Sequence, residues 1–281
     1  MHSIAFHIFG HPIHWYGICV ALGFLTALSV LQYKRSYAKM SAEQIFDIGL
    51  IAIFCGIGGA RLFYIIQFYH QFTGNFWKIF RIDQGGLVFY GGFLLAVAVL
   101  ILYAHLKKLS LARILDIYAP AIALGHAVGR IGCFLEGCCY GKVAKWGVVY
   151  PPNSNPAREF PDLLSPLSPS PSLPLIPVQL FEAAGNIALG VCLLLLFRKV
   201  KRPGQITALY FAAYGVLRFT LEFFRGDHKD FFLGFTPAQC IGLLIMLPCG
   251  LGVYWFLGRR KAPLEAEEKE LSSPPGKEEK K

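Results

Sequence analysis

The sequence is short of charged residues. Only 16% of its 281 residues are charged, whereas soluble domains have about 25%. Hydrophobic residues make up 55% of the chain, and the mean hydropathy is +0.49. Because a helix needs about 20 apolar residues to cross a bilayer, these long uncharged runs predict a polytopic membrane protein rather than a soluble domain.

The N-terminal segment lacks a basic stretch followed by an apolar core. Residues Met1–Pro12 do not have that pattern, so we expect no cleaved secretory signal peptide and interpret the first long apolar run as a retained span. The net charge of +10 is also not gathered on one segment. It occurs in short clusters between apolar runs, which indicates membrane topology rather than nucleic-acid binding.

Paired cysteine motifs of the kind that bind metals are missing. The chain has 8 cysteines and 8 histidines, but no CxxC pair. Cys133, Cys138 and Cys139 form the only cysteine cluster, and their spacing predicts no metal site and no thiol relay. Packing of small side chains is the favoured interpretation. A disulfide from Cys133 to Cys138 or Cys139 remains open if the cluster faces an oxidising compartment.

Seven apolar segments are predicted to cross the membrane as helices, which makes the fold an all-α bundle. The fourth is interrupted by Pro120, Gly125 and Gly129, which predicts a broken helix in this segment. The predicted spans are residues 15–33, 47–69, 87–105, 112–131, 177–197, 204–224 and 236–257.

Basic residues predict the orientation of the spans. Lysines and arginines follow spans one, three, five and seven, and with seven spans all four loops lie on one side. The positive-inside rule makes that side cytoplasmic. We therefore expect an external N-terminus and a cytoplasmic C-terminus.

Two segments are not predicted to lie in the membrane. Residues 151–177 are rich in proline and serine, which disfavours helix and predicts an irregular external loop. Residues 262–281 alternate charged residues with little apolar content and are predicted to be a disordered cytoplasmic tail. Residues 1–261 then form one transmembrane domain.

Several charged residues fall inside the predicted spans, where each costs about 2.5–3.5 kcal/mol to insert and is commonly functional. Arg218, Glu222 and Arg225 share one helical face in span six, by their spacing. By the expected topology, most of these groups lie toward the outer side of the membrane, as do two tyrosines at the starts of spans. The candidate charged and polar residues of the spans are Arg61, Arg130, Gln179, Glu182, Arg218, Glu222 and Arg225, and the two tyrosines are Tyr16 and Tyr90.

Arginines that converge in an apolar bundle suit an anionic lipid head group, because guanidinium binds phosphate oxygens bidentately. This predicts a protein that handles phospholipid. Structural roles remain open: Arg218 and Glu222 could form an internal ion pair, Arg225 could extend to the interface, and Arg61 could serve packing.

Several stretches together resemble the prolipoprotein diacylglyceryl transferase family, in the same order over about residues 10–260. The most specific is the signature-like run GRIGCFLEGCCYG at residues 129–141. The others are HWYG at 14–17, GARLFY at 59–64, GGLVFYGG at 85–92, PVQLFE at 177–182, and YGVLRF at 214–219 followed by Glu222 and Arg225.

The resemblance implies a seven-span enzyme of the bacterial inner membrane. Such an enzyme moves the diacylglyceryl group of phosphatidylglycerol to the lipobox cysteine thiol of a preprolipoprotein, forms a thioether and releases glycerol phosphate. It implies phosphatidylglycerol, the signal peptide and the lipid bilayer as partners, with no nucleic acid and no metal or organic cofactor.

The resemblance also suggests roles for residues. Arg130 matches the family's phosphatidylglycerol-binding arginine, and Tyr16 matches a required tyrosine. Arg218 and Glu222 match an important arginine and glutamate, with Arg225 on the same face. The remaining residues that we expect at the substrate are Gln179, Glu182 and Gly141.

The chain departs from the family pattern at four positions. Cys133 replaces an asparagine, Glu136 stands where another asparagine is common, and Cys138 replaces a glutamate. Tyr90 replaces the proposed catalytic histidine, and a phenol with a pKa near 10 is a poor base.

His126 lies one helical turn before Arg130, and we expect it or Glu136 to supply the base, with Tyr90 as a hydrogen-bond donor. These departures leave two alternatives: a non-catalytic or altered lipid-binding or transport paralogue, and a membrane thiol–disulfide enzyme.

Overall fold

The computed structural model describes residues 3–8, 10–72, 77, 79, 86, 88–165, 169–226 and 235–259. The chain divides into two compact units, one of Met1–Val30 with Leu115–Lys281 and one of Leu31–Ile114. The predicted tail at 262–281 lies outside the described residues.

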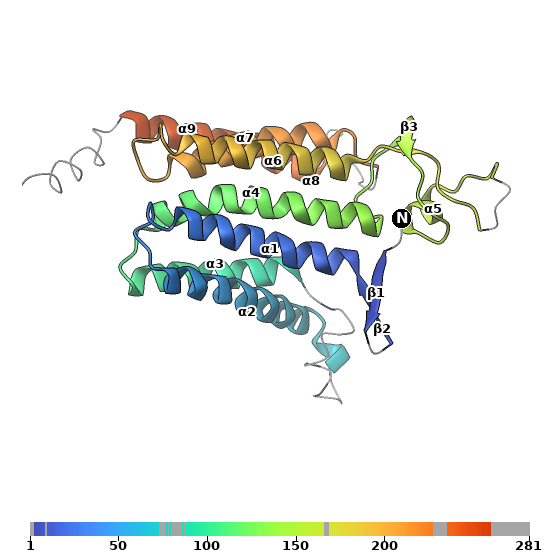
Figure 1. Cartoon of the computed structure of the whole chain (residues 1–281), viewed down its shortest axis with the longest axis horizontal. Helices are drawn as coiled ribbons and strands as arrows, with labels where there is room; N and C mark the ends of the chain where they lie inside the picture. Colours follow the sequence, from blue (N-terminus) through green and yellow to red (C-terminus); the bar gives the residue numbers. More distant parts are fainter. Residues whose placement is uncertain are drawn as a thin grey trace, which may run out of the picture. The chain divides into compact units, whose positions relative to one another are not determined.

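The described elements are mostly helices (Figure 1). In chain order they are β1 (Ile4–Ile8), β2 (His11–His14), α1 (Trp15–Lys34), α2 (Ala42–Gln67), η1 (Tyr69–Phe72), α3 (Phe89–Leu106), α4 (Leu111–Glu136), β3 (Val143–Val148), α5 (Asn155–Glu159), α6 (Val178–Leu196), α7 (Gln205–Glu222), α8 (Pro237–Ile241), the π-helical turn η4 (Gly242–Met246) and α9 (Leu247–Arg259).

Five helices of the described chain are long and apolar enough to cross a membrane: α1, α2, α4, α6 and the continuous segment Pro237–Arg259. The apolar part of α3, Tyr90–Leu106, is shorter. The helix α7 is not among the five, since it carries Arg218 and Glu222 in its last turns. The protein is therefore a mostly helical, polytopic membrane protein.

The strands are additions to the predicted all-α fold. β1 and β2 form an antiparallel hairpin directly before α1, with Phe6 opposite Ile13. Figure 1 shows this hairpin at the N-terminal end of α1. Its two strands have only 5 and 4 residues. An alternation of apolar and polar residues this short cannot be distinguished from a loop by periodicity alone.

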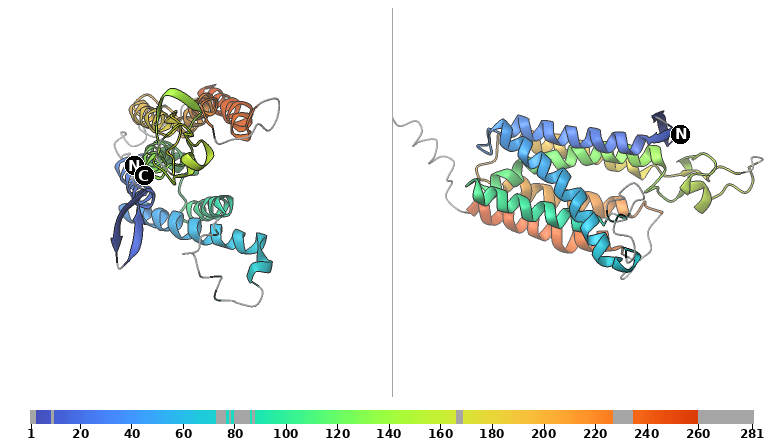
Figure 2. Two further views of the ribbon diagram at one scale, coloured as in Figure 1. Left: turned by 90° about the vertical axis from the view of Figure 1, so that its right-hand side faces the viewer. Right: turned by 90° about the horizontal axis from the view of Figure 1, so that it is seen from below.

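The helices α2 and α3 pack side by side (Figure 2). Ser41 begins α2 with a capping box, in which its side chain accepts from the Gln44 backbone and the Gln44 side chain accepts from the Ser41 backbone. Tyr103 donates a hydrogen bond of 2.7 Å to Asp47 across the pair. α2 therefore begins several residues before the predicted span.

The helix α4 is continuous from Leu111 to Glu136 although Pro120 lies inside it. Proline is tolerated in a membrane helix when neighbouring groups satisfy the freed carbonyl. The helix ends at Gly137, whose φ of +78° reverses the chain. Residues 132–136 therefore extend the helix beyond the predicted span.

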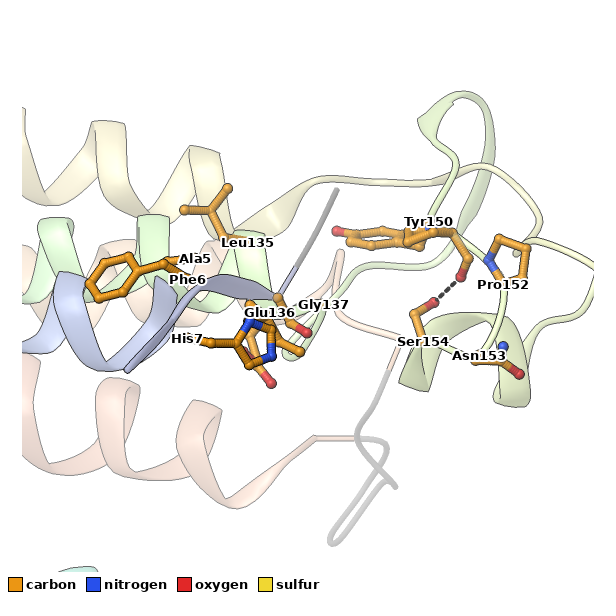
Figure 3. A pocket seen from close by; sticks show the side chains of 13 residues that line it. Ala5, Phe6, His7, Leu135, Glu136, Gly137, Tyr150, Pro152, Asn153 and Ser154 are labelled. Carbon is orange, nitrogen blue, oxygen red and sulfur yellow. Dashed lines mark hydrogen bonds between the residues drawn. The ribbon is translucent and has the colours of Figure 1, made fainter. Parts of the chain in front are cut away.

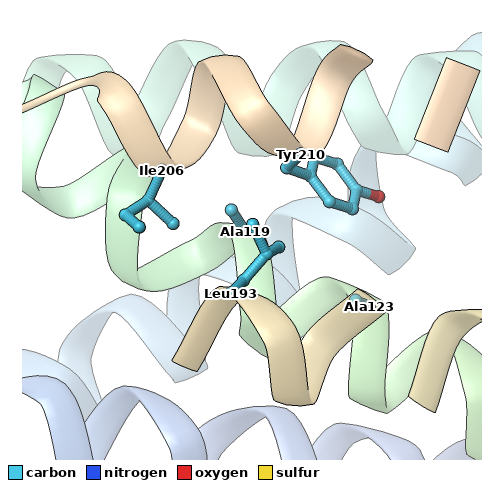
Figure 4. Close-up of a cluster of buried hydrophobic side chains, with 5 residues drawn as sticks. All are labelled: Ala119, Ala123, Leu193, Ile206 and Tyr210. Atoms are coloured by element: carbon cyan, nitrogen blue, oxygen red, sulfur yellow. The ribbon is translucent and has the colours of Figure 1, made fainter. Parts of the chain in front are cut away.

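A cluster of buried side chains joins α4, α6 and α7 (Figure 4). Ala119 and Ala123 of α4 meet Leu193 of α6 and Ile206 and Tyr210 of α7. Since α4, α6 and α7 carry Arg130, Glu182, Arg218 and Glu222, this packing fixes the frame of the candidate site.

A buried carboxylate connects α4 to the start of α7. Asp116, which is fully buried, accepts hydrogen bonds from the backbones of Gly204 at 2.7 Å and Thr207 at 2.9 Å. These N–H groups belong to the first turn of α7, where they have no intrahelical partner. Asp116 therefore caps α7 from a neighbouring helix.

Candidate active site

Two arginines from different helices approach one buried carboxylate. Arg130 near the end of α4 places Nη2 at 3.0 Å from Oε1 of Glu182 in α6. Arg218 of α7 places Nη1 at 4.0 Å from the other oxygen of Glu182. The Glu182 side chain is only 2% exposed, so it connects three helices in a region away from water.

A second carboxylate continues this arrangement along α7. Arg218 Nη2 lies 2.9 Å from Glu222 Oε2, and Arg225 Nε lies 3.9 Å from the same oxygen. The other oxygen of Glu222 accepts a hydrogen bond of 2.9 Å from Thr236, the N-cap of α8. The one-face spacing predicted from sequence is thus present as direct contacts.

We call these five residues the arginine–carboxylate network: Arg130, Glu182, Arg218, Glu222 and Arg225. Three cations and two anions leave a net charge of +1. Nη1 of Arg218 is buried and has no hydrogen-bond acceptor in the described part of the chain. A buried donor without an acceptor is rare in native proteins, so the network is suited to bind an anion.

His126 contacts the network one helical turn before Arg130. Nε of Arg130 donates a hydrogen bond of 3.0 Å to Nε2 of His126, and that nitrogen lies 3.6 Å from Glu182. Because Nε2 accepts here, the imidazole is neutral in this arrangement and carries its proton on Nδ1. The candidate base therefore lies within the network.

Gln179 and Gly141 bind neighbouring segments of the chain. Gln179, 1% exposed, donates hydrogen bonds to the Cys138 carbonyl at 2.8 Å and to the Tyr150 hydroxyl at 3.1 Å. A Cβ at Gly141 would lie 2.7 Å from the backbone oxygens of Ile176 and Phe224. Gln179 therefore holds the backbone at Cys138, and Gly141 lets the backbones at Ile176 and Phe224 approach closely. Both contacts are close in sequence to residues of the network.

The two tyrosines belong to different units of the chain. Tyr16 is 44% exposed and lines a cavity of ≈550 Å³ together with Glu136. Glu136 also lies 3.5 Å from Nδ1 of His14. Tyr90 belongs to the Leu31–Ile114 unit, where it is 70% exposed.

The structure brings the three clustered thiols together. The sulfur atoms of Cys133, Cys138 and Cys139 all lie within 4.8 Å of one another, and none is in a disulfide. Hydrogen bonds from Cys133 and Cys138 lower the pKa of the Cys139 thiol; burial opposes this, and the positive charges of Arg130 and Arg225 add to it. Arg225 and Cys139 thus influence each other electrostatically.

Comparison with known proteins identifies the family. Residues 3–256 match the family model described as prolipoprotein diacylglyceryl transferase. The chain belongs to this family.

Curated relatives support the assignment over nearly the whole chain. Phosphatidylglycerol–prolipoprotein diacylglyceryl transferase of Clostridium tetani is 32% identical, with 91% of this chain and 97% of the relative covered. The proteins of that name from Streptococcus uberis and Finegoldia magna are 30% and 31% identical. They cover 92% and 96% of this chain, and 95% and 100% of their own lengths are matched.

This member of the prolipoprotein diacylglyceryl transferase family has a second cavity beside the end of α4, of ≈600 Å³ (Figure 3). It is lined by residues 3–7 of the N-terminal segment, residues 135–137 and residues 150–154. Glu136 lines both cavities. An open space therefore lies next to the segment that contains the three thiols.

Sequence reasoning missed two contacts of the site. Thr236 binds Glu222, and Tyr214 places its ring 6.0 Å from that of His126. Tyr214 lies four residues before Arg218, so helical spacing could have placed it on the same face. For Thr236 the capping-box pattern with Gln239 signals a helix start, but nothing local indicates Glu222 as its partner.

Arg61 belongs to the other unit and has a structural environment there. Its Nε donates to the Ile79 carbonyl at 2.9 Å, and its Nη1 donates to the Gly86 carbonyl at 3.0 Å. The guanidinium carbon also lies 5.5 Å from the centre of the Tyr64 ring. Arg61 therefore binds two backbone carbonyls of its own unit, those of Ile79 and Gly86.

Proposed function

We propose that this protein transfers the diacylglyceryl group of phosphatidylglycerol to the lipobox cysteine thiol of a preprolipoprotein. The thiol sulfur forms a thioether, and glycerol phosphate leaves. This is the first step of bacterial lipoprotein maturation. Family membership and the names of the curated relatives support the reaction, and the network with a net positive charge supports a phosphate substrate. The alternatives of a non-catalytic paralogue and a thiol–disulfide enzyme are not favoured.

Arg130 and Arg218 bind the phosphate in this proposal. Both guanidinium groups face Glu182, and the unsatisfied Nη1 of Arg218 is the observation that carries the assignment. Guanidinium binds phosphate oxygens with two parallel hydrogen bonds. Hydrogen-bond donors that are already in position before the reaction stabilise the negative charge that develops on a leaving phosphate.

Glu182 and Glu222 keep the arginines in place before the lipid arrives. Glu182 positions Arg130 and Arg218, while Glu222 positions Arg218 and Arg225. Arg225 is buried, and the side chains of Arg130 and Arg218 are only 14% exposed. Three such cations without counter-ions would be strongly unfavourable in an apolar bundle. The two carboxylates therefore keep the three arginines in place, and the remaining charge of +1 can be neutralised by one bound anion.

His126 accepts the thiol proton in our hypothesis, and Glu136 is the second candidate. Nε2 of His126 is occupied by the N–H of Arg130, so phosphate binding that draws this N–H away would free the lone pair. The contacts favour His126 over Glu136, which lies beside His14. Full transferase activity in both His126→Gln and Glu136→Gln variants would contradict this role.

The substrate peptide occupies the cavities that Glu136 lines in this proposal. Their residues come from the N-terminal segment, the end of α4 and the loop after β3. Tyr16 lines the smaller cavity and can donate a hydrogen bond to the peptide or lipid. We assign Tyr90 to a hydrogen-bonding role as well.

We further propose seven spans, with the N-terminus outside the bacterial inner membrane and the C-terminus in the cytoplasm. The clusters of basic residues between the apolar segments support this orientation. The arginine–carboxylate network then lies toward the outer leaflet. Such a placement suits a peptide whose mature part lies outside the cell.

The release of glycerol phosphate tests the proposed function. Purified protein is mixed with phosphatidylglycerol vesicles and a lipobox peptide, and free glycerol phosphate is measured. We expect release only when both substrates are present. The same peptide with serine in place of cysteine should give none; equal release with that peptide would indicate hydrolysis and overturn the proposal.

A further inference from the structure

The turn after α4 brings the thiols of Cys133, Cys138 and Cys139 close together. Gly137 and Cys138 both donate their backbone N–H to the Cys133 carbonyl, at 3.0 and 3.1 Å. Gly137 has φ of +78° and Cys139 has φ of +59°, so the chain turns back over the last turn of the helix. The sequence spacing argued against a metal site, but this turn brings the three sulfur atoms within 4.8 Å of one another.

The arrangement fits a zinc ion with three sulfur ligands. Sulfur ligands about 2.3 Å from a tetrahedral zinc ion lie about 3.8 Å apart, so small side-chain rotations suffice. No fourth histidine, cysteine or carboxylate joins this group among the described residues. Three protein ligands and one open position are the pattern of zinc sites that act on a substrate.

The thiols are held beside the proposed phosphate site by several contacts. Cys133 lies three residues after Arg130 in α4, on the same face. Gln179, three residues before Glu182, binds the Cys138 carbonyl. Gly141 pairs with Arg225 as an isolated antiparallel bridge. The same helices that hold the network therefore hold the cysteine turn.

We propose that Cys133, Cys138 and Cys139 bind Zn²⁺, and that its open position takes the thiol of the substrate cysteine. The catalytic part rests on the proposed function. A thiol that coordinates a metal loses its proton, so zinc activates the sulfur in a chain that has Tyr90 where the family has a histidine.

The reaction balances without an oxidant or reductant. The substrate sulfur binds zinc and its proton passes to His126. A sulfur lone pair then forms the carbon–sulfur bond to the diacylglyceryl group, while the carbon–oxygen bond breaks and its electron pair leaves with glycerol phosphate. The neutral thioether is a weaker zinc ligand than a thiolate, so the product leaves and His126 returns its proton to water.

Cobalt substitution tests the metal site. The full-length protein in detergent is stripped with a chelator under reducing conditions and titrated with Co²⁺, which gives sulfur-to-cobalt charge-transfer absorption at a thiolate site. We expect one equivalent to produce that band, and zinc to displace it. The band should be lost in the variant that combines Cys133→Ser, Cys138→Ser and Cys139→Ser. It should be kept in Cys192→Ser, because Cys192 is exposed and lies outside the cluster.

Adding the lipobox peptide separates the two parts of the proposal. The cysteine peptide should change the cobalt spectrum and the serine peptide should not. Zinc removal should lower transferase activity on the order of 10- to 100-fold, because a free thiol with a pKa near 8.5 is only a few per cent thiolate at neutral pH. No charge-transfer band, or full activity of the triple serine variant, overturns the zinc site while the transferase assignment stands. A cobalt site that responds to the peptide without any transfer contradicts the proposed function instead.

Discussion

Glu182 has the central position among the charged residues of the site. It contacts Arg130 of α4 and Arg218 of α7 from its own helix, α6. Sequence spacing identified each of these groups, and it correctly placed Arg218, Glu222 and Arg225 on one face. It could not pair Arg130 with Glu182, because helical periodicity relates residues within one helix and says nothing about neighbouring helices.

We predict that Glu182→Gln lowers stability by about 3–5 kcal/mol, since removing one partner leaves buried cations uncompensated. Glutamine keeps the size of the side chain, so the loss reports charge rather than a cavity. Thermal unfolding in detergent, followed by circular dichroism, measures the difference, and phosphatidylglycerol binding should weaken in parallel.

Glu43→Gln is the matched control for this substitution, because Glu43 is exposed in the first turn of α2. Its unfolding midpoint should stay near that of the natural protein. If Glu182→Gln behaved like Glu43→Gln, the carboxylate would not be holding the arginines.

The helix α4 is the element that the sequence described least well. The glycines and Pro120 suggested an interruption, yet the helix continues to Glu136. One of these glycines has a packing role: a Cβ at Gly125 would lie 2.8 Å from the Gly23 carbonyl of α1. Small residues let helix backbones approach closely in membranes, which local propensity does not reveal.

Gly125→Ala is therefore expected to destabilise the protein by about 1–3 kcal/mol, the usual cost of overpacking. The atom that the new methyl group meets is backbone and cannot rotate away. Gly129→Ala in the same helix has nothing within 4 Å of its Cβ, so it should leave the unfolding midpoint unchanged or raise it. Equal midpoints for the two variants would mean that α1 and α4 do not approach at Gly125.

At the scale of the whole molecule, apolar runs predicted where the helices lie. Helices occur at the predicted segments, as α1, α2, α3, α4, α6, α7 and the α8–α9 segment, with shifted ends. Five of these described helices are long and apolar enough to cross a membrane, and the count of seven spans and their orientation stay predictions. The hairpin β1–β2 was not predicted, and the three thiols were expected at most to form a disulfide rather than to converge as a group of three. The hairpin is short, and the cluster depends on a left-handed turn at Gly137 and Cys139, which residue spacing does not encode.

Reporter fusions test the proposed orientation. Alkaline phosphatase is active only outside the cytoplasm, so a fusion after Lys108 should be inactive and a fusion after Leu164 should be active. The basic cluster near Lys108 and the exposed loop around Leu164 are expected on opposite sides. Activity in the reverse pattern would invert the topology and move the network to the inner leaflet.

The mass of the lipidated peptide tests the central claim most directly. A lipobox peptide is incubated with the protein and phosphatidylglycerol of one defined acyl composition, then analysed by mass spectrometry before and after hydroxylamine treatment. We predict a mass increase equal to the complete diacylglyceryl group, on the cysteine sulfur and resistant to hydroxylamine. An increase equal to a single acyl chain that hydroxylamine removes, or an unmodified peptide, would contradict diacylglyceryl transfer by this protein.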